Sequence, residues 1–369
     1  MPSRQLPIHF VLDPAATRWG DIAALGEPEI ERDPRRFVGG RNSWIAQSYV
    51  RLRAALGARG WEASAGPGFV PGALCIAHRD DVNRFLSPAH ASFLVVVRAD
   101  RAPVRACDFA IVQNGLGSSE HERFIPLWPQ PGLLARDPGR GERIERIAYH
   151  GRTGTVPGWF GDARFRSALA ARNVDFAVKE AGWEDYRAVD LALAARDELP
   201  EVLANKPATK LYNAWLAGAP LLASPEPAYT ALRRRFIDFI EVRDASDVLR
   251  SLDLLRAHPA LYAAMVANGL ERAREFTVAA VRARWLRLLD EELVPAFLAW
   301  REQGGGRRTW FLASMAQQKA LSRVHRIRCA ARRWQDWRAP RYASARPTTS
   351  PTLPESPSAA RIDSSAARA

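Results

Sequence analysis

Short runs of Ile, Leu, Val and Phe, separated by turn residues, set the pattern of the first part of the chain. They predict strands at residues 8–12, 73–77, 93–97, 109–112 and 124–127. The runs are continuous rather than alternating with polar positions, which favours strands buried on both faces of a parallel sheet. Apolar residues within 44–56 recur at helical spacing and predict a helix. Gly39 and Gly40, followed by an Asn-Ser cap, predict the turn that leads into its N-terminus.

A stretch rich in Pro and Gly, residues 129–141, predicts a linker to a second set of elements. Beyond it, strands are expected at residues 147–152 (running into a glycine turn), 174–178, 188–194, 219–223 and 236–242. Helices are expected over 210–217 and over most of 245–300. Strands that alternate with helices indicate an α/β fold. We therefore predict two α/β domains, residues 1–138 and 139–303, followed by a separate segment, residues 304–369.

The C-terminal segment carries most of the positive charge. From residue 301 onward there are 14 Lys/Arg and 4 Asp/Glu, a net charge of +10 against +13 for the whole chain. The main body is therefore close to neutral, and the overall basicity is no argument that this body binds nucleic acid. Three glycines at 304–306 predict a hinge, and residues 310–337 predict a basic amphipathic helix, charged over 307–338. The stretch from 340 onward has few large apolar residues and is predicted to be disordered.

Three kinds of contact are compatible with the composition of this basic helix. Aromatic and basic residues on one helix fit an anionic membrane surface. The same composition is compatible with packing on the body or on a partner protein. It is also compatible with nucleic acid, which we rank last.

Several classes of protein lack support in the sequence. Three widely spaced cysteines exclude a disulfide scaffold and a clustered metal motif, and suit a reducing cytosol. No apolar stretch is long enough to span a membrane, and the N-terminus does not read as a secretory signal. Sequence motifs of phosphate-loop enzymes, serine hydrolases and zinc proteases do not occur. We expect a cytoplasmic protein, peripheral at the inner face of the membrane if its helix binds there.

The segment from Asn205 to Pro220 is the most informative part of the sequence. A loop with Lys206 and Lys210 leads into a helix that ends in Gly-Ala-Pro before a buried strand. Backbone N–H groups at a helix N-terminus, with lysines beside them, form a phosphate site. The alternative is that the lysines are solvated and Gly-Ala-Pro only ends the helix.

This segment, KPATKLYNAWLAGAPLLA, resembles the donor-binding core of group 1 glycosyltransferases of the GT-B superfamily. Three weaker features agree: the strand and Gly-Arg turn at 149–152, the glycine pair at 39–40, and a C-terminal helix at 276–300 that resembles the helix crossing back to the first domain. The resemblance implies two Rossmann-like domains that face a cleft. It also implies transfer of a hexosyl-type sugar from a nucleotide-activated donor to a glycan or lipid-linked acceptor, in cell-surface polysaccharide assembly.

The resemblance also implies roles for individual residues. Gly39 and Gly40 would face the acceptor. The donor would be held by Gly151, Arg152, Asn205, Lys206, Thr209, Lys210, Tyr212 and Asn213. Among these, Arg152 and Lys210 are the first choices for the phosphates, because cations stabilise the charge that grows on a departing nucleoside diphosphate. No cofactor is implied, and no spaced Asp-x-Asp motif suggests a metal.

One departure from the family pattern affects the predicted chemistry. Where many retaining members carry Glu-x7-Glu, this chain has Asn205 and Asn213. An amide still hydrogen-bonds a hydroxyl, so donor binding is retained as an expectation, whereas retention or inversion is left open. Glu226 is either a replacement carboxylate or a surface acid. If transfer inverts, His78 or Asp80 is a candidate general base, the alternative being a loop residue without a role in proton transfer.

The two asparagines also motivate a rival hypothesis. On this hypothesis the chain is a catalytically inactive GT-B-fold binding protein, whose basic tail contacts a membrane or a nucleic acid.

Overall fold

The structure is a computed structural model that describes residues 6–12, 17–82, 88–116, 119–302 and 307–338. The chain divides into a large unit that ends at Ser322 and a second unit that begins at Arg323. The large unit holds two parallel sheets, each with its own helices. We call them the first and the second lobe. They match the predicted pair of α/β domains, while the boundaries at 138 and 303 stay predictions.

The first lobe is built on a six-stranded sheet with the order β2-β1-β3-β4-β5-β6, in which every pair of neighbours is parallel. Its strands are β1 (Leu6–Leu12), β2 (Trp61–Pro67), β3 (Leu74–His78), β4 (Phe93–Ala99), β5 (Phe109–Val112) and β6 (Glu122–Phe124). Along β4, Phe93, Val95 and Val97 pack in one apolar cluster and Leu94 and Val96 in another. Successive side chains of a strand point to opposite faces, so the continuous apolar run is buried on both sides, as predicted.

Three details of the first lobe differ from the sequence prediction. The strand β2 was not predicted, because its Glu-Ala-Ser-Ala-Gly sequence carries no apolar run. The last strand ends at Phe124, and the apolar residues after it are buried without forming a strand. The helix α2 (Arg41–Gly57) begins directly after Gly40, so Ser43 lies inside it rather than capping it. The Ser43 hydroxyl instead donates a hydrogen bond to the Gly39 carbonyl oxygen at 2.6 Å.

The second lobe is built on a five-stranded parallel sheet with the order β11-β10-β9-β7-β8. Its strands are β7 (Arg146–His150), β8 (Asp175–Lys179), β9 (Leu191–Ala194), β10 (Leu221–Ala223) and β11 (Ile240–Glu241). All five predicted strands are present. The last is only two residues long, because residues 236–238 form a 3-10 turn instead.

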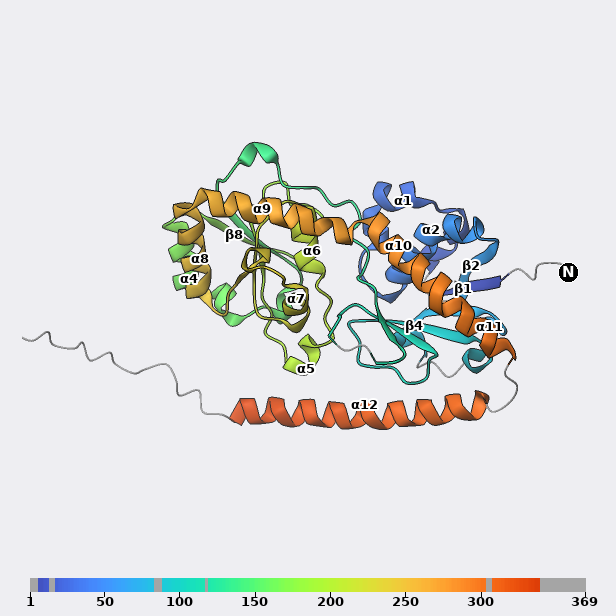
Figure 1. Ribbon diagram of the computed structural model, residues 1–369. Coiled ribbons are helices and arrows are strands. Elements are labelled where there is room, and N and C mark those ends of the chain that lie inside the picture. Colours follow the sequence, from blue (N-terminus) through green and yellow to red (C-terminus); the bar gives the residue numbers. More distant parts are fainter. Residues whose placement is uncertain (1–5, 13–16, 83–87, 117–118, 303–306, 339–369) are drawn as a thin grey trace, which may run out of the picture. The chain divides into compact units, whose positions relative to one another are not determined.

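Helices pack on the faces of both sheets (Figure 1). Besides α2, the α-helices of the described residues are α1 (Glu27–Arg32), α3 (Arg79–Val82), α4 (Ala163–Ala170), α5 (Pro200–Leu203), α6 (Thr209–Leu216), α7 (Pro227–Leu232), α8 (Ala245–Ala257), α9 (Pro259–Ala273), α10 (Val278–Leu288), α11 (Val294–Glu302) and α12 (Arg307–Arg338). Side chains of α10 and α11, such as Trp285 and Phe297, belong to the apolar core of the first lobe. The chain therefore returns from the second lobe to the first, in agreement with the crossing helix that the resemblance implied (Figure 1).

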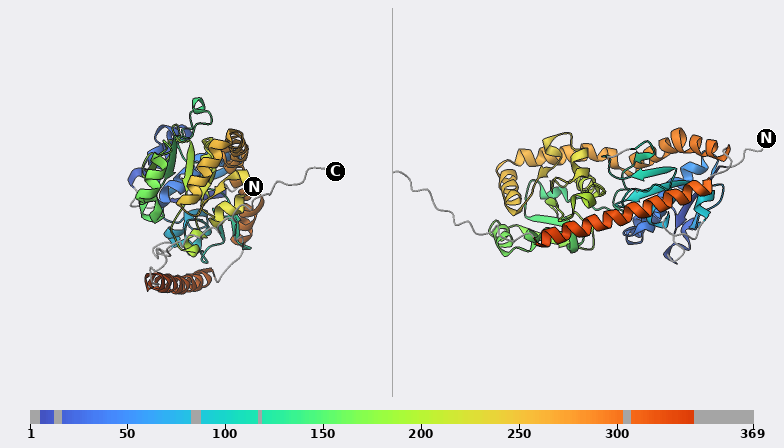
Figure 2. Two further views of the ribbon diagram at one scale, coloured as in Figure 1. Left: turned by 90° about the vertical axis from the view of Figure 1, so that its left-hand side faces the viewer. Right: turned by 90° about the horizontal axis from the view of Figure 1, so that it is seen from below.

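The basic C-terminal helix is present as α12, three residues longer at its start than predicted, and it runs without a break (Figure 2). Its first turns pack on the first lobe, where Phe311 and Met315 join the cluster beneath β4. Gln318 accepts a hydrogen bond from the Arg105 backbone N–H at 3.0 Å. Packing on the body is thus confirmed for this part of the helix. The predicted hinge at 304–306 and the predicted disordered stretch from 340 lie outside the described residues.

Candidate active site

A cavity of about 510 Å³ lies where both sheets present the carboxyl ends of their strands. Residues from the first lobe include His78 at the end of β3 and Asp100 just after β4; from the second lobe, His150 ends β7 and Arg196 follows β9. The loops at this edge of a parallel sheet are free to vary while the strands hold them in place, which is why open α/β sheets bind ligands there. The volume is typical of a small-molecule site.

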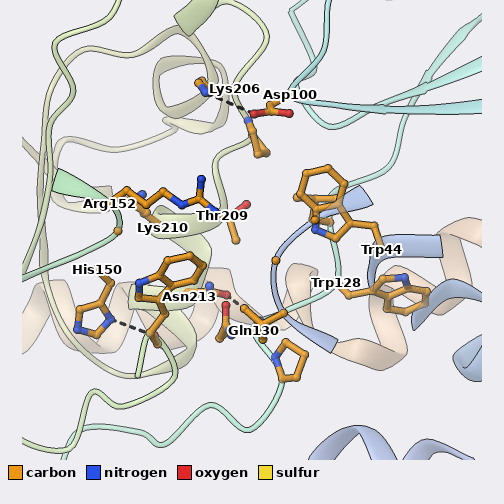
Figure 3. A pocket seen from close by; sticks show the side chains of 18 of the residues that line it. Trp44, Asp100, Trp128, Gln130, His150, Arg152, Lys206, Thr209, Lys210 and Asn213 are labelled. Carbon is orange, nitrogen blue, oxygen red and sulfur yellow. Dashed lines mark hydrogen bonds and ion pairs between the residues drawn. The ribbon is translucent and has the colours of Figure 1, made fainter. Parts of the chain in front are cut away.

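The second-lobe wall of this cavity is cationic (Figure 3). Arg152 follows the Gly151 turn, and Lys210 lies in the first turn of α6, with Thr209 beside it. A Cβ atom at Gly151 would lie 3.1 Å from the Lys210 ammonium, so the absence of a side chain there lets the turn and the lysine approach each other. Burial, together with the nearby Arg196 guanidinium, lowers the pKa of Lys210 to about 7. An anion bound here would favour the protonated form.

Arg196 lines the cavity in front of a buried carboxylate. Glu226, which is 1% exposed, accepts a hydrogen bond from the Arg196 guanidinium and a second, at 3.2 Å, from the Ser224 hydroxyl. Burial raises the pKa of Glu226, and the charges of Arg196 and Lys210 oppose that rise. Glu226 is therefore not the surface acid of the sequence hypotheses, and its role as a replacement carboxylate stays a prediction. It does not line the cavity, and it holds Arg196 in place.

A second carboxylate, Glu198, lines the cavity and was not found from the sequence. One of its oxygens lies 3.4 Å from the Lys206 ammonium. The other is buried, and no residue in the described part of the chain forms a hydrogen bond with it. Lys206 in turn pairs with Asp100 of the first lobe at 3.4 Å, so it connects two acids rather than standing free for a phosphate.

The two asparagines that replace the family carboxylates have different surroundings. Asn213 lines the cavity, and its amide oxygen accepts a hydrogen bond from the Gln130 backbone N–H at 3.2 Å. Asn205 lines a second cavity instead, where it accepts a hydrogen bond from Arg98 at 2.7 Å. Tyr212 is a core residue whose ring stacks on Phe276, so it does not reach the cavity.

The first-lobe wall carries aromatic residues. Trp44 and Trp128 face the cationic wall across the cavity, and Gly39 and Gly40 form the loop beside them (Figure 3). Trp44 and His78 pack against each other with ring centroids 5.6 Å apart. Both glycines have positive φ, which explains why glycine occupies the turn before α2.

Two buried histidines in the cavity walls have opposite tautomers in the neutral state. The Nδ1 atom of His78 accepts the Asp80 backbone N–H at 3.1 Å, so in the neutral ring the proton is on Nε2. The Nδ1 atom of His150 donates to the Trp183 carbonyl oxygen at 3.0 Å, so its Nε2 carries a lone pair. Burial lowers the pKa of each ring to about 4. Near neutral pH, His78 can donate a hydrogen bond and His150 can accept one.

Asp80 does not line this cavity, and its carboxylate is paired with Arg101 at 2.9 Å. Among the described residues no group of three or more His, Cys, Asp or Glu could hold a metal ion. No helix in the described part of the chain has the length and apolar character needed to cross a membrane.

No family model and no curated protein sequence matches this chain. Its fold is similar to that of solved glycosyltransferases. HepE of Anabaena in complex with UDP is 12% identical, with a TM-score of 0.47 over 78% of this chain and 99% of that one. Sucrose-phosphate synthase of Thermosynechococcus elongatus is 13% identical, with a TM-score of 0.49 over 79% and 100%. The pneumococcal O-GlcNAc transferase GtfA in complex with UDP and GlcNAc is 13% identical, with a TM-score of 0.39 over 66% and 60%.

The structure confirms the predicted pair of parallel α/β lobes, with C-terminal helices that return to the first lobe.

The site contains residues that sequence reasoning missed or underrated: Trp44, Trp128, Gln130, Arg196 and Glu198. Arg196 and Glu198 follow the strand β9 directly, and a charged residue at the carboxyl end of a parallel strand is a signal that could have found both. The two tryptophans carry no such signal, because tryptophans are equally common in cores.

Proposed function

We propose that this chain is a glycosyltransferase that moves a sugar from a nucleotide-activated donor to an acceptor without a metal. The observation that carries the proposal is the group of three cations, Arg152, Arg196 and Lys210, on one wall of the cavity at the carboxyl ends of parallel strands. Negative charge grows on the departing diphosphate as the glycosidic bond breaks, and donors aimed at that charge lower the barrier.

Each cation has a distinct part in this proposal. Glu226 holds Arg196 in one orientation, so the guanidinium loses little freedom when it binds an oxygen. The pKa of Lys210 is about 7, so near neutral pH this lysine takes up a proton when an anion binds. Arg152 is exposed and adds its charge from the Gly151 turn. Lys206 contributes less, because its charge is already matched by Asp100 and Glu198.

The donor sugar would lie beside Asn213 and Glu198. Asn213 replaces a family glutamate with an amide, and Glu198 offers an oxygen that has no partner within the protein. A buried acceptor without a partner is costly, and a sugar hydroxyl would satisfy it. We propose that Glu198, not Glu226, is the carboxylate that contacts the sugar.

The acceptor would lie against the first-lobe wall, beside Gly39, Gly40, Trp44 and Trp128. His78 was one candidate base, but its Nδ1 accepts the Asp80 backbone N–H, so Nε2 of the neutral ring carries the proton. We therefore propose that His78 donates a hydrogen bond to substrate rather than removing a proton. His150 presents a lone pair, but it lies on the donor wall.

Thermal unfolding with UDP, GDP, ADP, CMP and dTDP tests the donor site. A ligand at about 100 times its Kd stabilises by about 2.7 kcal/mol, which raises Tm by several degrees. One nucleotide should do so for the wild type, and the shift should be much smaller in Lys210→Ala and Arg196→Ala. If no nucleotide at millimolar concentration raises Tm, the proposed donor site is wrong.

Glu198→Gln tests the sugar contact. Its affinity for the stabilising nucleoside diphosphate should be unchanged, whereas its affinity for the matching nucleotide sugar should fall about tenfold, a loss typical of a hydrogen bond to a charged group. Asp100→Asn is the matched control, because it removes the other acid that pairs with Lys206 and leaves Glu198 intact. An equal, sugar-specific loss in Asp100→Asn would mean that Glu198 acts only through Lys206.

The rival hypothesis, an inactive binding protein, predicts nucleotide binding without turnover. Incubating the protein with the nucleotide sugar that stabilises it, and measuring release of the nucleoside diphosphate, separates the two. Release that depends on Lys210 supports the transferase. Binding without release supports the rival.

The outer part of α12 suits a lipid-linked acceptor. Leu321, Val324 and Ile327 are exposed on a helix segment rich in arginine. We propose that this segment contacts an anionic membrane surface. The protein should co-sediment with vesicles that contain phosphatidylglycerol, and not with pure phosphatidylcholine. Binding should weaken in salt and in Ile327→Glu, and binding to neither vesicle would contradict the proposal.

A further inference from the structure

A second cavity, of about 300 Å³, lies next to the candidate active site. Its wall includes Ala99 and Asn205, whose neighbours in sequence, Asp100 and Lys206, line the first cavity. Consecutive Cα atoms are about 3.8 Å apart. On each of these two chain segments, adjacent residues therefore line the two cavities.

The charges in this cavity are matched. Arg98 and Glu122 form an ion pair at 2.7 Å. Arg98 also donates a hydrogen bond to the Asn205 amide oxygen at 2.7 Å. A phosphate would therefore find no excess positive charge here, unlike in the first cavity. The lining favours a neutral ligand.

The polar groups that remain are amides. Asn114 and Asn205 are held by hydrogen bonds to backbone carbonyl oxygens, those of Ala204 at 2.6 Å and Glu201 at 2.7 Å. Gln113 is different. It is 4% exposed, and its buried amide oxygen has no hydrogen-bond partner among the described residues. A buried acceptor of this kind points to a ligand that donates a hydrogen bond.

The rest of the lining is apolar: Ala99, Pro103, Val112, Leu116 and Ala204. A ligand that combines hydroxyl donors with a C–H face, and carries no charge, matches amides and apolar groups together. A sugar ring has that chemistry. The volume suits one small molecule rather than a nucleotide sugar.

We propose that the second cavity is a carbohydrate subsite, in which Gln113 accepts a hydrogen bond from a hydroxyl of a neutral sugar ring. The assignment of this ring to the acceptor rests on the proposed transferase function. The binding of a sugar ring in the second cavity is independent of that function. Asp100 and Lys206, which pair between the two cavities, would then lie between this sugar ring and the donor.

Saturation-transfer NMR with methyl glucoside, methyl galactoside, methyl mannoside and methyl N-acetylglucosaminide tests the subsite on the full-length protein. At about 20 mM, a concentration that detects millimolar binding, at least one glycoside should give a signal. Gln113→Leu, which keeps the bulk and removes the acceptor, should weaken its binding about fivefold to tenfold. Gln130→Leu is the matched control, because Gln130 lines the first cavity only, and it should leave glycoside binding intact.

Other outcomes overturn the proposal. They are no signal with any of the four glycosides, or a signal lost in Gln130→Leu but kept in Gln113→Leu, which would place the sugar in the first cavity. If Gln113→Leu does not fold, a crystal of the wild type soaked with the bound glycoside decides: density beside Gln113 supports the subsite, and density elsewhere refutes it. Nucleotide-induced stabilisation is scored separately, so failure of the proposed function is distinguished from failure of the subsite.

Discussion

The two walls of the main cavity are built alike but carry different chemistry. Each consists of loops at the carboxyl ends of parallel strands. The second-lobe wall collects cations: Arg152, Arg196, Lys206 and Lys210. On the first-lobe wall, Trp44 and Trp128 stand beside a neutral His78, and Arg101 is paired with acids. The shared fold therefore does not assign donor and acceptor sides. We propose that the unequal charge does, because the second wall carries the cations that would match a diphosphate.

Removal of a cation from each wall gives the largest expected difference. Lys210→Ala should weaken UDP binding, or binding of whichever nucleotide stabilises the protein, by about 30-fold to 100-fold, as expected for loss of a hydrogen bond between charged groups. Arg101→Ala, the matched change on the first-lobe wall, should weaken it less than about threefold, because Asp80 and Asp100 already balance that charge. Titration calorimetry measures both. Equal losses of nucleotide affinity in Lys210→Ala and Arg101→Ala would contradict the proposal that the second-lobe wall alone binds the diphosphate.

The pH dependence of nucleotide binding sharpens the same contrast. The pKa of Lys210 is lowered to about 7, so above pH 7 the free protein must take up a proton to bind the diphosphate. Affinity should fall about 50-fold between pH 7 and pH 9, about fivefold over the first unit and nearly tenfold over the second. Stability of the ligand-free protein changes in the opposite sense: the unfolded chain binds more protons over this range, so this group makes folding more favourable as the pH rises. In Lys210→Arg, affinity should be nearly independent of pH from 7 to 9. A wild-type profile equally flat would contradict the role of Lys210.

The walls were not equally predictable from the sequence. The cationic wall could be located because its helix, its Gly-Arg turn and its lysines lie in continuous stretches of chain; its role in donor binding stays a prediction. The strands of both sheets were predicted because burial on two faces requires unbroken apolar runs. Strand β2, with its small and polar residues, carries no such signal.

The failures have a common physical cause. The partner of Glu226 is Arg196, 30 residues away, and the partner of Lys206 is Asp100, across the two lobes. A sequence shows which groups are charged, but the matching of charges depends on contacts between distant segments. It therefore could not distinguish a buried structural carboxylate from one that has a free oxygen in the cavity.

The buried histidines should make both walls equally sensitive to acid. His78 and His150 have pKa values lowered to about 4, so between pH 6.5 and 4 protons bind the unfolded state first and stability falls with the pH. Each histidine should account for about 2 kcal/mol of the stability lost between pH 7 and pH 5. His78→Gln keeps an acceptor for the Asp80 N–H. In this variant the free energy of unfolding, measured with urea, should fall by about 2 kcal/mol less between pH 7 and pH 5 than in the wild type. His258→Gln, at an exposed position, should behave as the wild type.

The smallest effect is expected from the two glycine turns, one on each wall. Gly40 has a φ of +79°, and a Cβ atom there would meet nothing within 4 Å. Its ψ of 162° puts it in a region that is essentially restricted to glycine, so Gly40→Ala should cost backbone strain alone, about 1–3 kcal/mol of stability, and leave nucleotide affinity unchanged. At Gly151 the added Cβ would lie 2.9 Å from the Tyr149 ring and 3.1 Å from the Lys210 ammonium. Gly151→Ala should therefore displace the lysine and weaken nucleotide binding as well as stability. Thermal unfolding with and without the nucleotide measures both quantities for each variant. If Gly40→Ala lowers nucleotide affinity as much as Gly151→Ala does, the diphosphate contacts both walls, and the assignment of one wall to the donor is wrong.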